Sequence, residues 1–244
     1  MPPSLYGGTE RVVAHLTDSL VELGHNVTLF ASGEARTAGR LVPVRERAIR
    51  LDPSPLKSDV AAHLAMLHEV RGRAHEFDIL HFHIDLIHFP FFEGIADRTL
   101  TTLHGRLDLA DLAGVYRRWP AFPLVSISDS QRQPLSFANW LATVHHGIPP
   151  QLFDYRAAHR GYLAFVGRIS PEKRPDRAIE VARRAGVPLR LAAKVDAVDV
   201  KYFREDIEPL LKQPHVEFLG EVDDAAKNEL LGGAAALIFP IDWP

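Results

Sequence analysis

Two cations, Arg168 and Lys173, flank a short loop in the stretch Phe165–Lys173, between an apolar run and a predicted helix. Arginine offers a planar fork to phosphate oxygens, and lysine offers a compact positive charge. The helix that follows adds the partial positive charge of its first turn. These residue types in this order therefore predict a diphosphate site. The alternative is that both side chains are solvated surface cations.

A glycine pair, Gly7 and Gly8, precedes another predicted helix. Glycines before a helix let the backbone approach an anion closely, which again suits a phosphate or an acceptor group. The alternative is an ordinary glycine-rich turn. Neither the Gly-x-Gly-x-x-Gly fingerprint of dinucleotide-binding proteins nor the P-loop motif occurs in the sequence.

Histidines gather near the predicted carboxyl ends of strands in the first half of the chain. They are His81, His83, His88, His104, His145 and His146. A metal site built on two of them and a third ligand is one interpretation, but no carboxylate or cysteine stands at metal-ligand spacing. Polar residues lining a cleft are the favoured interpretation. The absence of any Asp-x-Asp pair in the sequence also favours charge neutralisation by side chains and helix ends, with no metal and no cofactor.

Composition narrows the class of protein. The 244 residues are 46% hydrophobic and 24% charged, which is typical of a globular protein. With a net charge of -3 and no basic block, a nucleic acid partner is not expected. The absence of cysteine excludes disulfides and thiol nucleophiles and fits a reducing cytoplasm.

The hydrophobic periodicity predicts two alternating series of strands and helices. The first has strands at 27–31, 79–83, 99–103, 124–128 and 142–145, a weaker one at 41–44, and helices at 10–23, 58–73 and 130–138. The second has strands at 162–166, 189–193, 216–219 and 235–239, and helices at 176–185, 200–212 and 223–231. Thr9 and Ser128 are predicted helix caps, and Gly24 a left-handed helix stop. This alternation predicts an α/β fold with parallel sheets.

The segment Gly147–Pro150, with one glycine and two prolines, is a predicted linker. It divides the chain into two predicted Rossmann-like domains, residues 1–150 and 151–244, that face each other across a cleft. The helix after Gly8 should be the crossover of a βαβ unit, yet few residues precede it. Both domains are therefore expected to be incomplete in this sequence.

These elements, in this order, resemble those of the retaining, nucleotide-sugar-dependent glycosyltransferases of family 4, which have the GT-B fold. The resemblance covers nearly the whole chain and rests on Gly7–Glu10, His104-Gly105, the Gly-Arg-x-x-x-x-Lys spacing that contains Arg168, and Val216–Gly220. It implies that residues 1–150 bind the acceptor and residues 151–244 the nucleotide-sugar donor. It also implies that transfer proceeds without a metal.

The same resemblance assigns roles to individual residues. His104 would contact the transferred sugar as the catalytic residue. The donor diphosphate would be bound by Arg168, Lys173, Gly7 and Gly8, and the nucleobase side by the loop of Gly220, Glu221 and Val222. The acceptor would be a glycan, a lipid or a small molecule, and peripheral membrane contact stays open for a cytoplasmic enzyme.

The sequence also departs from the family pattern. His146-Gly147 replaces a frequent Asn-Gly, and Lys194 stands where glycine is common, with solvation favoured over a phosphate contact. The family's two glutamates, seven residues apart, have no counterpart before Pro244. The alternative is therefore a non-catalytic fragment or a sugar-nucleotide-binding remnant. A sugar-nucleotide epimerase is less favoured, because no acid/base carboxylate set is present.

Overall fold

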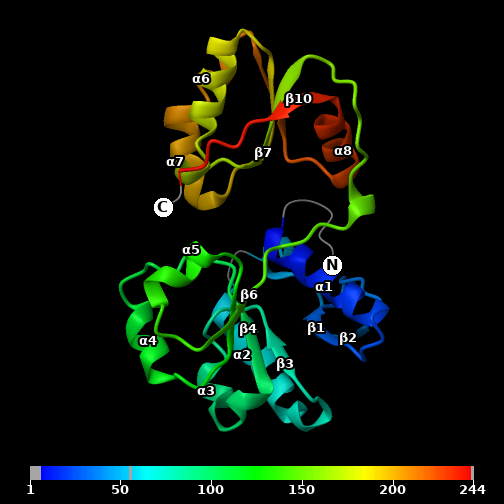
Figure 1. Cartoon of the computed structure of the whole chain (residues 1–244), viewed down its shortest axis with the longest axis vertical. Coiled ribbons are helices and arrows are strands. Elements are labelled where there is room, and N and C mark those ends of the chain that lie inside the picture. Colours follow the sequence, from blue (N-terminus) through cyan, green and yellow to red (C-terminus); the bar gives the residue numbers. More distant parts are fainter. Residues whose placement is uncertain (1–6, 55–56, 243–244) are drawn as a thin grey trace. The chain divides into compact units, whose positions relative to one another are not determined.

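The computed structural model describes residues 7–54 and 57–242. Contacts between residues divide this part of the chain into two compact units, residues 7–148 and 149–242 (Figure 1). Each unit has its own parallel β-sheet and its own hydrophobic core.

The first unit begins with helix α1 (Gly8–Glu22), which leads into strand β1 (Thr28–Ser32). Gly24 has a φ of 90°, so the predicted left-handed stop after this helix is confirmed. The predicted cap is wrong: Gly7 is the N-cap residue, and no side chain in the described part of the chain caps the helix. Thr9 is the second residue of the helix, two positions after the N-cap. Strand β2 (Arg40–Arg45) pairs with β1 in parallel and confirms the weakly predicted strand.

A second sheet in this unit has the order β3-β4-β5-β6, and all of its strands are parallel. The strands are β3 (Leu80–Phe82), β4 (Thr99–Thr102), β5 (Leu124–Ser126) and β6 (Trp140–Thr143). The helices are α2 (Asp59–Gly72), α3 (Phe89–Phe92), α4 (Leu112–Arg118) and α5 (Asp129–Arg132), with 3₁₀ turns at Ile49–Leu51, Ala74–Glu76, Glu93–Arg98 and Gln133–Leu135. A further 3₁₀ turn, Pro150–Leu152, lies in the second unit. The Ser128 hydroxyl accepts a hydrogen bond from the Gln131 amide at 3.1 Å, so this predicted cap is confirmed.

Aromatic side chains fill the core of the first unit. His88 lies among them, fully buried, and its ring stacks on Phe82 with the centroids 3.9 Å apart. Its Nε2 and the Thr101 hydroxyl lie 3.0 Å apart in a hydrogen bond. The expectation that His88 lines a cleft is therefore wrong. It is a core residue, because the chain turns inward after β3 and buries the Phe89–Phe92 helix against the sheet.

The second unit has a four-stranded parallel sheet of order β10-β7-β8-β9. Its strands are β7 (Tyr162–Arg168), β8 (Leu189–Lys194), β9 (Val216–Gly220) and β10 (Ala234–Leu237), and its longer helices are α6 (Pro175–Ala185) and α8 (Asp224–Gly233). The helix predicted over 200–212 is broken into α7 (Val200–Tyr202), a π-helical turn at Phe203–Ile207 and a 3₁₀ turn at Leu210–Lys212. Pro209 lacks the amide that a continuous helix needs there.

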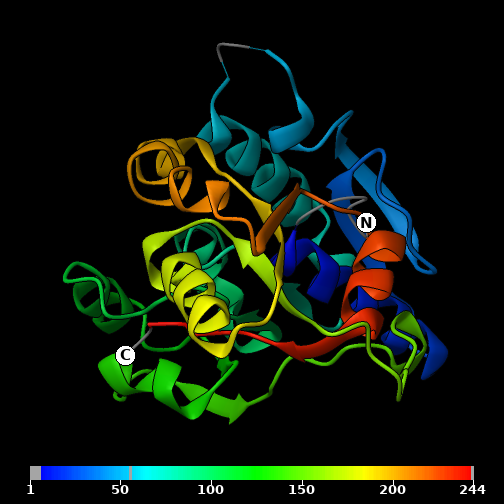
Figure 2. The same ribbon diagram turned by 90° about the horizontal axis from the view of Figure 1, so that it is seen from above.

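Helices cover both faces of this sheet. Leu163 and Phe165 of β7 pack in the cluster that contains Ile179 of α6, whereas Tyr162 and Ala164 pack with Leu230 of α8. The alternation follows the two-residue period of a strand. Figures 1 and 2 show α6 and α8 on opposite sides of the strands. The predicted α/β class with Rossmann-like parallel sheets is therefore confirmed.

Candidate functional site

The predicted phosphate site lies at a strand-to-helix turn of the second unit. Arg168 is the last residue of β7 rather than a loop residue, because the strand continues its pairing with β8 as far as Lys194. Lys173 ends a 3₁₀ turn that begins at Pro171, and Pro175 opens α6. Between them Arg174 has a left-handed φ of 52°. Both cations thus lie at the carboxyl end of the sheet, where open α/β sheets bind ligands.

Three carboxylates surround Arg168. Its Nη2 lies 2.5 Å from Oε1 of Glu172, its Nη1 3.6 Å from Oδ2 of Asp196, and its Nε 3.6 Å from Oδ2 of Asp199. One-third of the Arg168 side chain stays exposed. An anion that binds Arg168 must therefore share it with these carboxylates. The sequence signal for Glu172 was its position four residues after Arg168, but nothing local pointed to the aspartates.

Burial changes the acidity of groups around this turn. Desolvation lowers the pKa of the Lys173 ammonium; Glu172 opposes this effect, and the charge of Arg168 adds to it. The Nζ atom of Lys173 also lies 5.3 Å from the centroid of the Phe239 ring. Burial raises the pKa of Asp199, although Arg168 acts in the opposite direction. Lys173 is thus a partly desolvated cation, which an incoming phosphate would stabilise.

Further ion pairs balance the charge of neighbouring cations. Lys194 Nζ lies 2.6 Å from Oδ1 of Asp196, and its side chain is 22% exposed. The preference for a solvated Lys194 is therefore wrong. Its backbone pairs with Arg168 in the sheet, so the two side chains share one carboxylate neighbour. Arg174 forms a bidentate pair with Asp176, at 3.0 and 2.7 Å.

The loop predicted on the nucleobase side follows β9 in the same unit. Gly220 has a φ of 69°, which favours glycine. Glu221 is exposed, whereas Val222 packs against the cluster of Tyr162 and Leu230. Gly220 and Glu221 are accessible to a ligand, and Val222 supports the loop from below.

The first unit brings four histidines together, which we call the histidine cluster: His81, His83, His104 and His146. Nδ1 of His83 and Nε2 of His104 form a hydrogen bond of 2.9 Å, and Nδ1 of His104 and Nε2 of His146 lie 3.4 Å apart. His81 packs against the His83 ring, with a centroid distance of 4.2 Å, and shares a 2.8 Å hydrogen bond with the Thr102 hydroxyl. His104 is therefore held from two sides.

His145 lies outside the cluster and bonds instead to the Ile127 carbonyl oxygen through Nδ1, at 3.0 Å. Within residues 7–54 and 57–242, no three histidine or carboxylate side chains are arranged to hold a metal ion. His83, His104 and His146 face one another through their ring nitrogens and form a chain of imidazoles, on which His81 packs through the ring of His83.

Burial lowers the pKa of every member of the cluster. The pKa falls to about 4 for His81 and His104 and to about 2 for His83, where the charges of His81 and His104 add to the effect of burial. Burial also lowers the pKa of His146. Near neutral pH the cluster is therefore uncharged, and each imidazole has one donor and one acceptor nitrogen.

We expect these histidines to make stability depend on pH. Burial lowers the pKa of core residue His88 to about 3, below the ordinary 6.5, so folding favours its neutral form. This stabilisation is complete above pH 6.5 and is lost as the pH falls towards 3. His88→Phe should therefore reduce the slope of unfolding free energy against pH by about 1.4 kcal/mol per unit between about pH 6.5 and 4.5.

Urea unfolding of the parent and of His88→Phe at several pH values measures this slope. Comparing the two proteins cancels the contributions of all other groups, including Asp85 and Asp199, whose pKa values burial raises. Loss of the Thr101 hydrogen bond should lower stability equally at every pH. Equal slopes in the two proteins would show that His88 is not held neutral.

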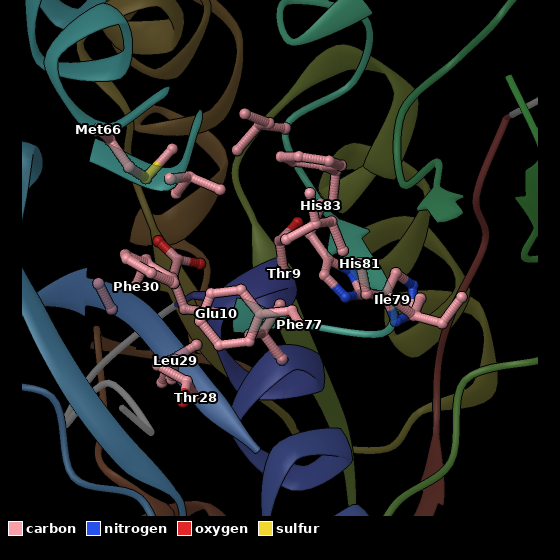
Figure 3. A pocket seen from close by; sticks show the side chains of 16 residues that line it. Thr9, Glu10, Thr28, Leu29, Phe30, Met66, Phe77, Ile79, His81 and His83 are labelled. Atoms are coloured by element: carbon pink, nitrogen blue, oxygen red, sulfur yellow. The ribbon is translucent and has the colours of Figure 1, made fainter. Parts of the chain in front are cut away.

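A cavity of about 290 Å³ joins the start of α1 to the histidine cluster. Thr9 and Glu10 of α1 line it together with His81 and His83 at the end of β3 (Figure 3). A Cβ atom added at Gly8, the first residue of α1, would meet no atom within 4 Å. The predicted glycine site directly precedes Thr9, and the predicted catalytic histidine hydrogen-bonds to His83; both belong to the first unit, whereas Arg168 and Lys173 belong to the second.

Comparison with known families decides what kind of protein this is. The family model described as Glycosyltransferase Family 4 matches residues 6–132, more than half of the chain. The chain belongs to glycosyltransferase family 4. The matched range includes Gly7, Gly8 and His104.

Solved structures of glycosyltransferases have the same fold. AviGT4, a glycosyltransferase involved in avilamycin A biosynthesis, is 22% identical with a TM-score of 0.68; the alignment covers 99% of this chain and 64% of AviGT4. The lipopolysaccharide outer core galactosyltransferase WaaB is 14% identical with a TM-score of 0.56, covering 98% of this chain and 72% of WaaB. The family 4 chain thus spans 64% of the length of AviGT4 and shares the GT-B architecture. No curated protein matches the sequence.

No helix in the described part of this family 4 chain is long and apolar enough to span a bilayer.

Proposed function

We propose that this protein transfers a sugar from a nucleoside-diphosphate sugar to an acceptor, with retention of the anomeric configuration and without a metal. The observation that carries the proposal is the pair Arg168 and Lys173 at a strand-to-helix turn, in a chain of glycosyltransferase family 4. Transfer needs stabilisation of a departing diphosphate, and fixed cations supply it without the reorganisation that water would require.

The ion pairs around Arg168 suit this role. Glu172 and Asp196 hold the guanidinium in place before the donor arrives. When a diphosphate binds, two phosphate groups compete with carboxylates for the same N–H donors, and charge-assisted bonds to phosphate are strong. Lys173 adds a charge that burial leaves poorly solvated. Gly220, Glu221 and Val222 would border the nucleobase, and Gly7 and Gly8 would approach the diphosphate through backbone amides.

His104 would contact a hydroxyl of the transferred sugar. Because its pKa falls to about 4, the imidazole is neutral at pH 7 and can donate one hydrogen bond while accepting another. The ring nitrogens are close to His83 and His146, so a sugar hydroxyl would replace the longer contact, at 3.4 Å, more readily than the one at 2.9 Å. His104 therefore serves as an uncharged sugar ligand.

The test is incubation of the protein with UDP-, GDP- and dTDP-sugars in excess EDTA. We expect release of the nucleoside diphosphate from one of these donors, at the same rate with and without chelator, and the α-anomer of the sugar by NMR from an α-linked donor. Loss of turnover in EDTA with recovery on adding zinc would contradict the metal-free mechanism. Binding without turnover would favour the non-catalytic alternative, and no binding of any donor would overturn the proposal.

A further inference from the structure

A second cavity of the first unit lies on the other side of His83. It has a volume of about 530 Å³, which is in the range of sites for small organic ligands. Half of its lining residues are aliphatic: Ile84, Leu86, Ile87, Leu107, Leu109 and Leu112. We call this cavity the Asp85 pocket.

Asp85 and Tyr116 are the polar groups that distinguish this pocket. Asp85 has a left-handed φ of 54°, which few non-glycine residues adopt. Its carboxylate forms no hydrogen bond or ion pair with any described residue, and burial raises its pKa although one side is open to solvent. Both residues line the pocket, where burial and then the charge of Asp85 raise the pKa of the Tyr116 hydroxyl.

The Tyr116 hydroxyl is likewise without a hydrogen-bond partner in residues 7–54 and 57–242, although only 2% of this residue is exposed. A carboxylate that accepts and a phenol that donates match a single alcohol group, which does both. The rest of the lining consists of the six aliphatic side chains, Gly105, and the polar side chains of His63, His83 and Arg106. Hydroxyl groups placed against the aliphatic side chains would stay unsatisfied, at a cost in binding free energy, so this part of the pocket favours an apolar segment of the ligand.

The pocket adjoins the proposed reaction centre. His83 lines it, and the same imidazole is hydrogen-bonded to His104 at 2.9 Å. Gly105 and Arg106, the residues after His104, also line it. A molecule bound in the Asp85 pocket would therefore contact residues that adjoin His104, the histidine proposed to contact the transferred sugar.

We propose that the Asp85 pocket binds the acceptor, and that the acceptor is an amphiphile: an apolar body that carries a hydroxyl group. The aliphatic walls hold the body, and Asp85 and Tyr116 orient the hydroxyl. This inference rests on the proposed glycosyl transfer and adds the chemical class of its second substrate.

The experiment compares the binding of octyl β-D-glucoside, kept below its micelle concentration, with that of methyl β-D-glucoside, by saturation-transfer NMR and calorimetry. We expect the octyl compound to bind at least about 10-fold more tightly, because its chain buries several methylene groups. Leu109→Ser should weaken octyl glucoside binding about 5-fold. Asp85→Asn, which keeps the left-handed backbone accessible, should weaken binding of both glucosides about 3- to 10-fold.

Leu141→Ser is the matched control. Leu141 on β6 is 62% exposed, against 52% for Leu109, and lies outside the pocket. We expect it to leave affinity unchanged. Equal binding of the two glucosides, or equal losses in Leu109→Ser and Leu141→Ser, would overturn the proposal. UDP binding measured on the same samples separates the two hypotheses. Binding of octyl glucoside without binding of UDP would refute glycosyl transfer and leave an amphiphile site. Binding of UDP without preferential binding of octyl glucoside would refute only the proposed role of the Asp85 pocket.

Discussion

Arg168→Ala is expected to weaken UDP and GDP binding by about 10- to 150-fold, corresponding to about 1.5–3 kcal/mol for hydrogen bonds to a charged group. The loss should lie towards the upper end of this range. Without the guanidinium, the carboxylates of Glu172, Asp196 and Asp199 would face the diphosphate with less compensating charge. Isothermal titration calorimetry with each nucleotide measures the effect, and Lys173→Ala should give a loss of the same order.

Arg184→Ala provides the control in the same unit. Arg184 lies on α6, is 75% exposed and pairs with Glu180 at 2.6 Å, away from the strand-to-helix turn. Its removal should leave nucleotide affinity unchanged. Thermal melting of all variants checks that the fold persists, because loss of Arg168 also removes the cation shared by three partly buried carboxylates. Unchanged affinity in both Arg168→Ala and Lys173→Ala would eliminate the diphosphate site.

His104→Ala is expected to lower the rate of nucleoside diphosphate release from the accepted sugar donor by about 10²- to 10³-fold, the effect of removing one hydrogen-bond donor from a reacting centre. UDP affinity should stay nearly constant, because His104 is proposed to contact the sugar and not the phosphates. Steady-state kinetics with the donor identified in the EDTA experiment, together with calorimetry with UDP, separate the two effects.

The neighbouring histidine supplies the control for this experiment. His145 is exposed, and the Ile127 carbonyl oxygen is its only hydrogen-bond partner among the described residues, so His145→Ala should retain the parent rate. His104→Ala with full activity would show that the histidine cluster has a structural role. Equal losses in both variants would point to a general disturbance of the strand ends.

Local signals in the sequence predicted most of the secondary structure. The continuous apolar run of β7, the cap at Ser128 and the left-handed Gly24 each depend on a few neighbouring residues, so they can be recognised without the fold. The exceptions have one local and one long-range cause. Pro209 interrupts the predicted helix over 200–212, and strand pairing with Lys194 extends β7 to Arg168.

The roles of the site residues stay predictions, but their surroundings could only come from tertiary structure. The sequence by itself determined the alternating α/β pattern and the presence of cations at a strand end. Only the fold decided that Asp196 and Asp199 share Arg168, and that His83, His104 and His146 form one chain. Residues from different strands meet because parallel strands end at one edge of a sheet, and the strand order that brings them together is set by long-range packing rather than by sequence neighbours.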